Sequence, residues 1–167
     1  MERLFLETKI LVDEAGAIEG LAWPFGTPDR LGDVIEKGAF AGVRAPLPML
    51  FGHDPKDPVG VWTDAIEGTD GLRLKGKLLV DDVARAREVR ALVRSGAVGG
   101  LSIGFITRKA EPRKGGGRTI KALNLVECSL VAIPMHPGAR VTSAKSAAAA
   151  LAIAGALHRA ALAISKR

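Results

Sequence analysis

The feature that most constrains this fold is a series of short segments in which apolar and polar residues alternate, separated by turn residues such as Gly, Asp and Pro. A period of two is typical of β-strands that bury one face. The pattern predicts strands at residues 3–12, 17–23, 48–52, 59–67, 72–80, 98–107 and 119–133. The first two are expected to form a hairpin. Residues 24–38 are expected to form a long loop, followed by a helical turn at residues 39–44.

A helical period replaces this alternation at residues 81–95, which have an acidic start and are followed by Gly96. Apolar residues recur there at helical spacing: Val83, Ala86, Val89, Leu92 and Val93. A second helix, rich in Ala, is expected at residues 144–166. The 167 residues suit one domain, which we place at residues 1–143, with residues 144–167 as a helical tail. The predicted fold class is α+β and β-rich.

Composition narrows the classes of function. The apolar fraction of 47% and the charged fraction of 25% are ordinary for a globular protein. The chain has no Tyr and only two Trp residues, so a surface that stacks nucleic-acid bases is not expected. Neither paired cysteines nor an H-E-x-x-H pattern occurs, so we expect no metal and no cofactor. The only cysteine, Cys128, cannot form an internal disulfide, which suits a cytoplasmic setting.

Hydropathy and charge give two further expectations. The charged N-terminal segment does not resemble a secretory signal, and the longest apolar stretch, residues 147–157, is too short to span a bilayer, so no membrane association is expected. Much of the net charge of +6 lies in residues 108–121 and at the C-terminus. We interpret residues 108–121 as a solvated loop, with contact to an acidic scaffold or to DNA as the alternatives.

Residues 100–104, Gly-Leu-Ser-Ile-Gly, match the pattern G-x-S-x-G. In α/β-hydrolases this pattern places the serine on a turn between a strand and a helix. Here the residues after Ser102 predict more strand, so that context does not fit. In a strand, Ser102 shares a face with Gly100 and Gly104, which would leave its hydroxyl accessible to an extended polypeptide. The alternative is a half-buried strand with one small polar residue on its solvent side.

A serine hydroxyl becomes a nucleophile only when a base removes its proton, and histidine is well matched to that task near neutral pH. The candidates are His53, His136 and His158. His53 lies where an apolar strand ends in a turn, a usual place for a functional group on a rigid scaffold. His136 is expected in a loop, and His158 on the surface of the Ala-rich tail.

A carboxylate is suited to orient and stabilise the histidine. Glu127 interrupts an otherwise apolar strand, where an unpaired buried charge would be costly, so it is expected to face a partner. Asp54 is adjacent to His53 and should point away from it. Asp81 and Asp82 remain as alternatives for this third role.

Several motifs occur in a fixed order: Gly20-Leu21-Ala22 with Phe25-Gly26 and Asp29, Gly32-Asp33-Val34-Ile35 before Gly38-Ala39-Phe40, Gly52-His53-Asp54 with Pro58-Val59-Gly60, Gly71-Leu72, Leu101-Ser102-Ile103-Gly104-Phe105, and Glu127-Cys128-Ser129-Leu130-Val131 with Ile133-Pro134. With this order and spacing, residues 20–140 resemble the phage prohead proteases of the HK97 type, relatives of the herpesvirus assembly proteases.

The resemblance implies an incomplete, bent β-barrel of the herpesvirus-protease type with a central helix. It implies that Ser102 is the nucleophile and His53 the general base. Glu127 stands at the third position, which is a histidine in the herpesvirus branch. The resemblance also implies that a backbone N–H near Met135 or His136 helps to form an oxyanion hole.

The implied function is that of a serine endopeptidase, packaged inside the immature capsid in the bacterial cytoplasm. Its partners would be the major capsid protein, whose scaffolding region it cleaves, and further copies of itself, which it degrades. Two other classes compete with this hypothesis. One is a non-catalytic scaffold or assembly factor that retains the barrel, and the other is an esterase of the α/β-hydrolase fold, which requires a helix directly after Ser102.

Overall fold

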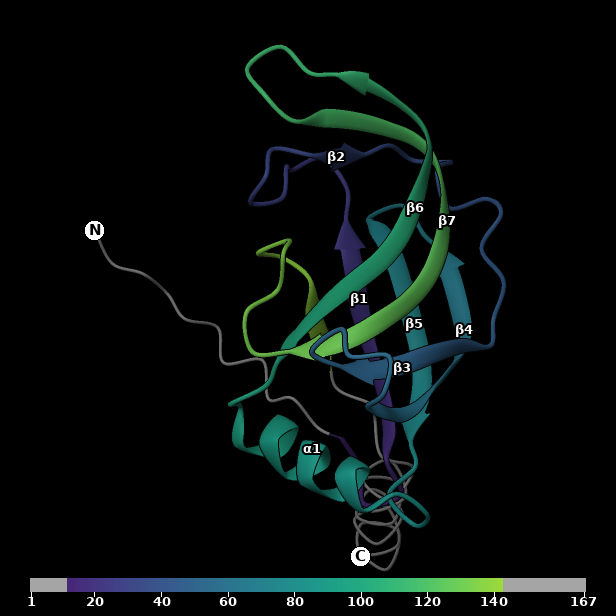
Figure 1. Cartoon of the computed structure of the whole chain (residues 1–167), viewed down its shortest axis with the longest axis vertical. Helices are drawn as coiled ribbons and strands as arrows, with labels where there is room; N and C mark the ends of the chain where they lie inside the picture. The colour runs from purple at the N-terminus through teal and green to yellow at the C-terminus, as the bar shows by residue number, and fades with distance from the viewer. Residues whose placement is uncertain (1–11, 143–167) are drawn as a thin grey trace, which may run out of the picture.

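The computed structural model describes residues 12–142 as a β-barrel with one helix packed at its end (Figure 1). The elements follow the chain as β1 (Ala17–Pro24), β2 (Val34–Ile35), β3 (Leu47–Phe51), β4 (Pro58–Glu67), β5 (Gly71–Leu78), α1 (Ala84–Ser95), β6 (Gly100–Pro112), β7 (Arg118–Val131) and β8 (Arg140–Thr142). Within these residues, no helix is long and apolar enough to cross a membrane.

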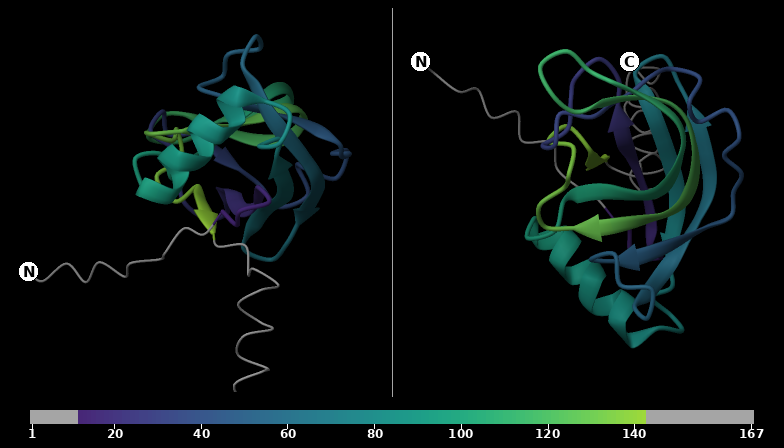
Figure 2. Two further views of the ribbon diagram at one scale, coloured as in Figure 1. Left: turned by 90° about the horizontal axis from the view of Figure 1, so that it is seen from below. Right: turned by 45° about the horizontal axis from the view of Figure 1, so that its top comes forward.

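Seven of the eight strands close a ring in the order β7-β3-β4-β5-β1-β8-β6, and β6 returns to β7. The closure is weak at one seam, because β8 pairs with β6 only between Gly100 and Arg140. The β6–β7 hairpin is interrupted by bulges, which bend strands. It curves around one side of the barrel and extends beyond it toward β2 (Figures 1 and 2). The expected incomplete, bent barrel is confirmed.

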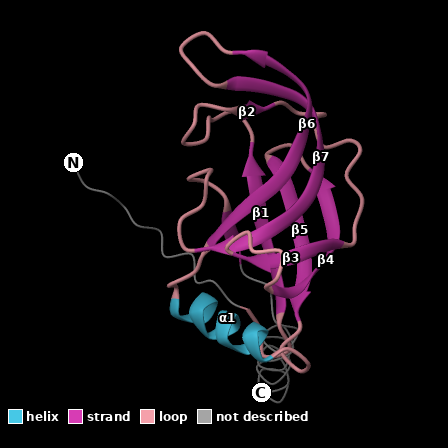
Figure 3. Cartoon of the chain, in the orientation of Figure 1, coloured by secondary structure: helices cyan, strands magenta, loops and turns pink. Residues whose placement is uncertain are grey.

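The barrel interior is filled by large apolar side chains. The largest fully buried ones include Trp62, Ile18, Met49, Leu72, Leu74, Leu78, Leu101 and Leu130. Trp62 also satisfies its polar atom, since Nε1 donates to the Cys128 carbonyl at 2.9 Å. Helix α1 buries Ala86, Val89 and Val93 and covers the end of the barrel opposite the hairpin tip (Figure 3). In the barrel wall β7 pairs with β3 on one side and with β6 on the other.

Six of the predicted strands are confirmed, with shifted ends. Two short strands were missed: β2 lies inside the expected loop of residues 24–38, and β8 follows a segment rich in Pro and Gly. The helix begins at Ala84, after Asp81 and Asp82 rather than at them. In place of the helical turn expected at residues 39–44, residues 39–42 form turns and residues 43–44 have no regular structure. The strand expected at residues 3–12 and the Ala-rich helix fall on residues outside the described range, apart from Val12, which is not in a strand.

The basic segment at residues 108–121 is solvated as predicted, since all of it but Ile120 is at least partly exposed, but it is mostly strand, so the prediction of a loop was wrong. Strand β6 continues to Pro112, and β7 begins at Arg118. Two of its cations are paired, since Arg118 binds Asp33 and Lys121 binds Glu111 at 2.6 Å. The same continuation of β6 beyond Ser102 excludes the α/β-hydrolase alternative, which needs a helix at that point.

Candidate active site

Ser102 lies near the start of β6, opposite Ser129 of β7, and is only 7% exposed. The two glycines on the same face of β6, Gly100 and Gly104, leave space that other side chains of this chain occupy. A Cβ atom at Gly100 would come within 2.7 Å of the Pro134 side chain, and one at Gly104 within 2.3 Å of Glu127 Oε1. The expectation that these glycines leave an open face for a polypeptide was therefore wrong at both positions.

His53 follows β3 in a tight turn. Gly52 and His53 both have left-handed backbone conformations, with φ of 64° and 63°, which is uncommon for a residue with a Cβ atom. Two hydrogen bonds fasten this turn to β7: the Gly52 N–H donates to the Leu130 carbonyl at 3.1 Å, and the His53 N–H donates to Ser129 Oγ at 3.0 Å. The turn directs the imidazole toward Ser102 while 44% of the side chain stays exposed.

The structure brings Ser102, His53 and Glu127 together. His53 Nε2 lies 2.8 Å from Ser102 Oγ, and His53 Nδ1 lies 2.8 Å from Glu127 Oε1. An ionised carboxylate only accepts hydrogen bonds, so Nδ1 carries the proton and donates to Oε1. In the neutral ring Nε2 is then the acceptor, and the Ser102 hydroxyl donates to it. This is the protonation state that a general base needs before it takes a serine proton.

Glu127 is nearly buried, and both of its oxygens are hydrogen-bonded. Oε1 accepts from His53, and Oε2 accepts from the Ser129 hydroxyl at 2.6 Å. The expectation that this carboxylate faces a partner is met by these two contacts, which compensate for burying its charge.

The other acidic candidates lie elsewhere. Asp54 Oδ1 accepts from the Lys56 N–H at 2.8 Å, so its side chain closes its own turn. Asp81 lies 3.8 Å from Lys77 Nζ, and Asp82 is exposed just before α1. His53 Nδ1 is already bonded to Glu127, so the structure does not bring these residues into the third role.

The remaining histidine of the described residues holds a loop together. His136 is buried, and its Nδ1 accepts from the Gly138 N–H at 3.0 Å. Nε2 therefore carries the proton and donates to the Thr27 carbonyl at 3.1 Å. His136 joins residues 134–138 to the segment after β1, and none of its hydrogen bonds within residues 12–142 is to Ser102. His158 lies outside the described residues.

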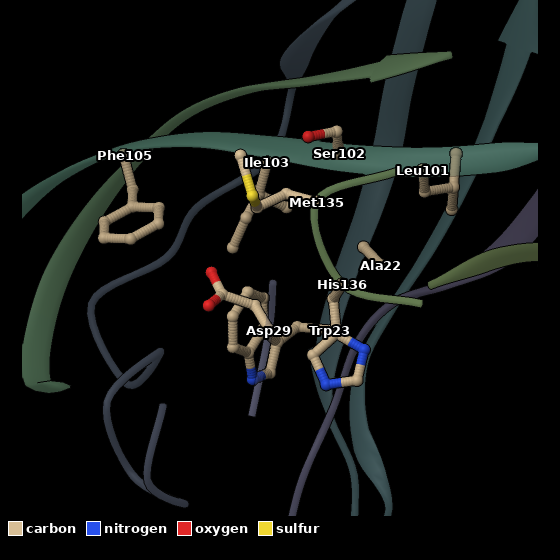
Figure 4. A pocket seen from close by; sticks show the side chains of 9 residues that line it. All are labelled: Ala22, Trp23, Asp29, Leu101, Ser102, Ile103, Phe105, Met135 and His136. Carbon is tan, nitrogen blue, oxygen red and sulfur yellow. The ribbon is translucent and has the colours of Figure 1, made fainter. Parts of the chain in front are cut away.

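A small pocket with a volume of about 30 Å³ adjoins Ser102. Its lining is mostly apolar and comes from β1, the loop after β1, β6 and the loop after β7: Ala22, Trp23, Asp29, Leu101, Ser102, Ile103, Phe105, Met135 and His136. In Figure 4, Ser102 lies at the upper edge of the pocket, and Asp29, Trp23 and His136 lie below it. Ser102 and the loop that carries Met135 therefore border the same pocket.

Arg30, which no sequence motif indicated, fixes the loop that carries Met135. Its Nε donates to the Pro134 carbonyl at 3.2 Å, and its N–H donates to the Met135 carbonyl at 3.2 Å. In a trans peptide the N–H points opposite to the C=O, so the N–H groups of Met135 and His136 point away from Arg30. Within residues 12–142, neither N–H donates a hydrogen bond.

Cys128 lies between Glu127 and Ser129 but points into the barrel core and is fully buried. Burial raises the pKa of its thiol well above the ordinary value, and the charge of Glu127 adds to the increase. A thiol held in its neutral form is a poor nucleophile. Cys128 is therefore a core residue despite its place beside the site.

Comparison with known proteins gives a consistent set of relatives. The caudovirus prohead serine protease family matches residues 6–152. The chain is 35% identical over 148 residues to the capsid polyprotein of Pseudomonas phage PAJU2 and 32% identical over 141 residues to the prohead protease of Enterobacteria phage HK97. It is 30% identical over 126 residues to the prohead protease of Escherichia phage T5.

These matches cover 84%, 78% and 71% of this chain, but only 22%, 61% and 58% of the respective relatives. The chain thus spans less than two thirds of the length of each.

Among solved structures, KSHV protease in complex with a hexapeptide phosphonate inhibitor is similar, with a TM-score of 0.51 and 17% identity over 75% of this chain and 63% of that one. At that identity the likeness shows the fold alone. On the family match and the phage relatives, the chain belongs to the caudovirus prohead serine protease family.

Proposed function

We propose that this chain is a serine endopeptidase that cleaves the scaffolding region of the major capsid protein during prohead maturation. One observation carries the proposal: two successive 2.8 Å contacts join Ser102 Oγ to His53 Nε2, and His53 Nδ1 to Glu127 Oε1. This is the geometry expected of a nucleophile, its general base and the carboxylate that orients the base. Membership of the prohead serine protease family supports the same function.

In the proposed reaction, Ser102 Oγ attacks the carbonyl carbon of the scissile peptide bond while His53 Nε2 takes the serine proton. Glu127 stabilises the imidazolium and holds its tautomer. His53 then gives the proton to the leaving amine as the C–N bond breaks, which leaves an acyl ester on Ser102. His53 next removes a proton from water, whose oxygen attacks the ester, and returns that proton to Ser102 as the new C-terminus departs.

The loop after β7 is the proposed oxyanion hole. Met135 and His136 border the same pocket as Ser102, and neither of their N–H groups donates to another group of residues 12–142. Arg30 fixes the two peptide planes that carry these N–H groups. A donor already oriented before the reaction stabilises the tetrahedral oxyanion without reorganisation.

The substrate and setting are inferred from the relatives. Two relatives are named prohead proteases and one is named a capsid polyprotein. We therefore assign the capsid protein and its scaffolding region as the substrate, the interior of the immature capsid in the host cytoplasm as the place of action, and self-cleavage as a second reaction. An extended substrate segment would cover the exposed side of His53.

Co-expression with the major capsid protein of the same particle tests the proposal. Wild-type enzyme should shorten the capsid protein, whereas Ser102→Ala and His53→Ala should leave it intact. Ser95→Ala is a matched control, because Ser95 caps the end of α1 by donating to the Leu92 carbonyl. Mass spectrometry of the capsid protein's N-terminus reads the outcome. Full processing by Ser102→Ala would rule out the serine mechanism.

A fluorophosphonate probe tests the nucleophile without knowledge of the substrate. Such a probe forms a covalent bond with an activated serine, so wild-type protein should be labelled at Ser102, as located by peptide mapping. A correctly folded protein that remains unlabelled and leaves the capsid protein intact would favour the non-catalytic assembly factor instead.

A further inference from the structure

Ser102, His53 and Glu127 are called the relay below. Beyond these three residues, we propose that Ser129 is a positioning residue that holds both His53 and Glu127 in their reactive geometry. The proposal rests on the serine protease function proposed above. Ser129 lies on β7 next to β3 and β6, paired with Leu50 on one side and Ser102 on the other. It is therefore at the centre of the three strands that carry the site.

The Ser129 side chain makes two hydrogen bonds of opposite sense. Its Oγ accepts from the His53 backbone N–H at 3.0 Å and donates to Glu127 Oε2 at 2.6 Å. A hydroxyl has one proton and two lone pairs, so the same group can serve both partners at once. The residue is fully buried, with 0% exposure, so water does not compete for either contact.

The first contact acts on the histidine backbone. The left-handed conformation of His53, with φ of 63°, is unfavourable for a residue with a Cβ atom and persists only where surrounding contacts impose it. The bond from the His53 N–H to Ser129 Oγ is one such contact. It fixes the backbone from which the imidazole reaches Ser102.

The second contact acts on the carboxylate. With Oε2 held by Ser129, Oε1 is left to accept from His53 Nδ1 at 2.8 Å. Removal of the hydroxyl would leave Oε2 buried without this donor and free the carboxylate to rotate toward another partner. Ser129 thus fixes both the rotation of the Glu127 carboxylate and the backbone of His53, the residue that the carboxylate orients.

The test compares Ser129→Ala, Ser129→Thr and the control Cys128→Ala. Cys128 is the adjacent fully buried residue of β7, so its truncation removes a similar volume from the same strand without touching the relay. The readouts are kcat and KM for capsid-protein cleavage, the rate of fluorophosphonate labelling at Ser102, and the thermal unfolding temperature.

Ser129→Ala should lower kcat and the labelling rate by about 10- to 100-fold with KM unchanged, as expected when a group that orients a reacting side chain is lost. Ser129→Thr keeps the hydroxyl and should recover most of the rate. Cys128→Ala should retain nearly the full rate even if its unfolding temperature falls.

Two results would overturn the positioning role. One is a Ser129→Ala labelling rate within two-fold of the wild type, and the other is an equal loss in Ser129→Ala and Cys128→Ala that follows their loss of stability. If Ser129→Ala does not fold, Ser129→Cys replaces it, because the thiol fills the space of the hydroxyl but is a weaker donor. A folded Ser129→Cys protein that is labelled at the wild-type rate would also overturn the positioning role. Failure of the proposed function gives a different result, because the wild-type protein itself would then not be labelled at Ser102.

Discussion

Gly104 lies directly against Glu127: a Cβ atom at position 104 would come within 2.3 Å of Glu127 Oε1. The two residues are paired across β6 and β7. The same Oε1 accepts the hydrogen bond from His53 Nδ1. The second glycine of the G-x-S-x-G segment therefore creates the space in which the carboxylate meets the histidine.

Gly104→Ala should for this reason reduce activity while the serine and histidine stay in place. The added methyl group must push Glu127 away from His53, and a displacement of about 1 Å in a catalytic group can cost on the order of 100-fold in rate. The rate of fluorophosphonate labelling at Ser102 measures the loss. Gly42→Ala is the control, because a Cβ atom there meets nothing within 4 Å. Equal labelling rates for the two variants would show that Glu127 tolerates the shift.

Arg30→Ala should weaken the proposed oxyanion hole without disturbing the relay. It removes the Nε donor to the Pro134 carbonyl, while the backbone bond from Arg30 to the Met135 carbonyl and the contacts of His136 remain. Loss of a whole oxyanion donor costs roughly 100- to 1,000-fold, so a loosened donor should lower kcat by about 10-fold or more. Arg30→Lys should restore little, because an ammonium group does not reproduce the geometry of the guanidinium Nε.

The control for Arg30 is Arg44→Ala, whose guanidinium donates, within residues 12–142, only to carbonyls of its own turn, those of Ala41 and Val43. Steady-state kinetics on the capsid protein give kcat for each variant. If Arg30→Ala and Arg44→Ala have the same kcat, the loop does not depend on Arg30.

Much of the barrel could be predicted from sequence because its long strands bury alternate residues. The period of two located β4 and β5, and the change to a helical period located α1. Strands β2 and β8 are too short, at two and three residues, to show any period. Their strand geometry depends on pairing with β7 and β1, which no local pattern reveals.

The site was only partly predictable for a similar reason. Ser102 could be selected by its G-x-S-x-G segment, His53 by its place at the end of a strand, and Glu127 as a charge inside an apolar strand. A choice between Glu127 and Asp81 or Asp82, however, needs the pairing of β7 with β3 and β6. The spacing of Ser129 two residues after Glu127 placed both on one face of the strand, which is the one signal that could have revealed their hydrogen bond. The hydrogen bond from the His53 N–H to Ser129 Oγ depends on the left-handed conformation of His53, which its residue type does not predict.

Asp33 should make stability depend on pH in the acid range. The hydrogen bond from the Arg118 guanidinium lowers the pKa of the Asp33 carboxyl, against the opposing effect of burial. A lowered folded-state pKa stabilises the fold above the unfolded-state value of about 3.9, and this stability is lost as pH falls through the folded-state pKa. Because half of the Arg118 side chain is exposed, the pair contributes about 1 kcal/mol or less.

Asp33→Asn should therefore lower the unfolding temperature by about 2–4 °C at pH 7 and lessen its further fall below pH 4. Thermal unfolding followed by circular dichroism from pH 7 to pH 2 measures both effects. Asp82→Asn changes an exposed carboxylate outside this pair and should keep the wild-type pH dependence. A steep acid fall that is identical in Asp33→Asn and the wild type would assign the effect to other carboxylates.

Cys128 offers a test that separates a serine from a cysteine mechanism. Burial, followed by the charge of Glu127, raises the pKa of its thiol, so at pH 8 less thiolate is present than in an exposed cysteine, and the side chain is inaccessible. Iodoacetamide should therefore neither modify nor inactivate the folded protein, while a fluorophosphonate labels Ser102. In guanidinium chloride the single cysteine should react fully. Rapid inactivation of the folded protein with modification mapped to Cys128 would contradict a serine mechanism. Complete loss of activity in a folded Cys128→Ala variant would contradict it as well. Neither outcome is compatible with a buried, neutral thiol that only fills the core.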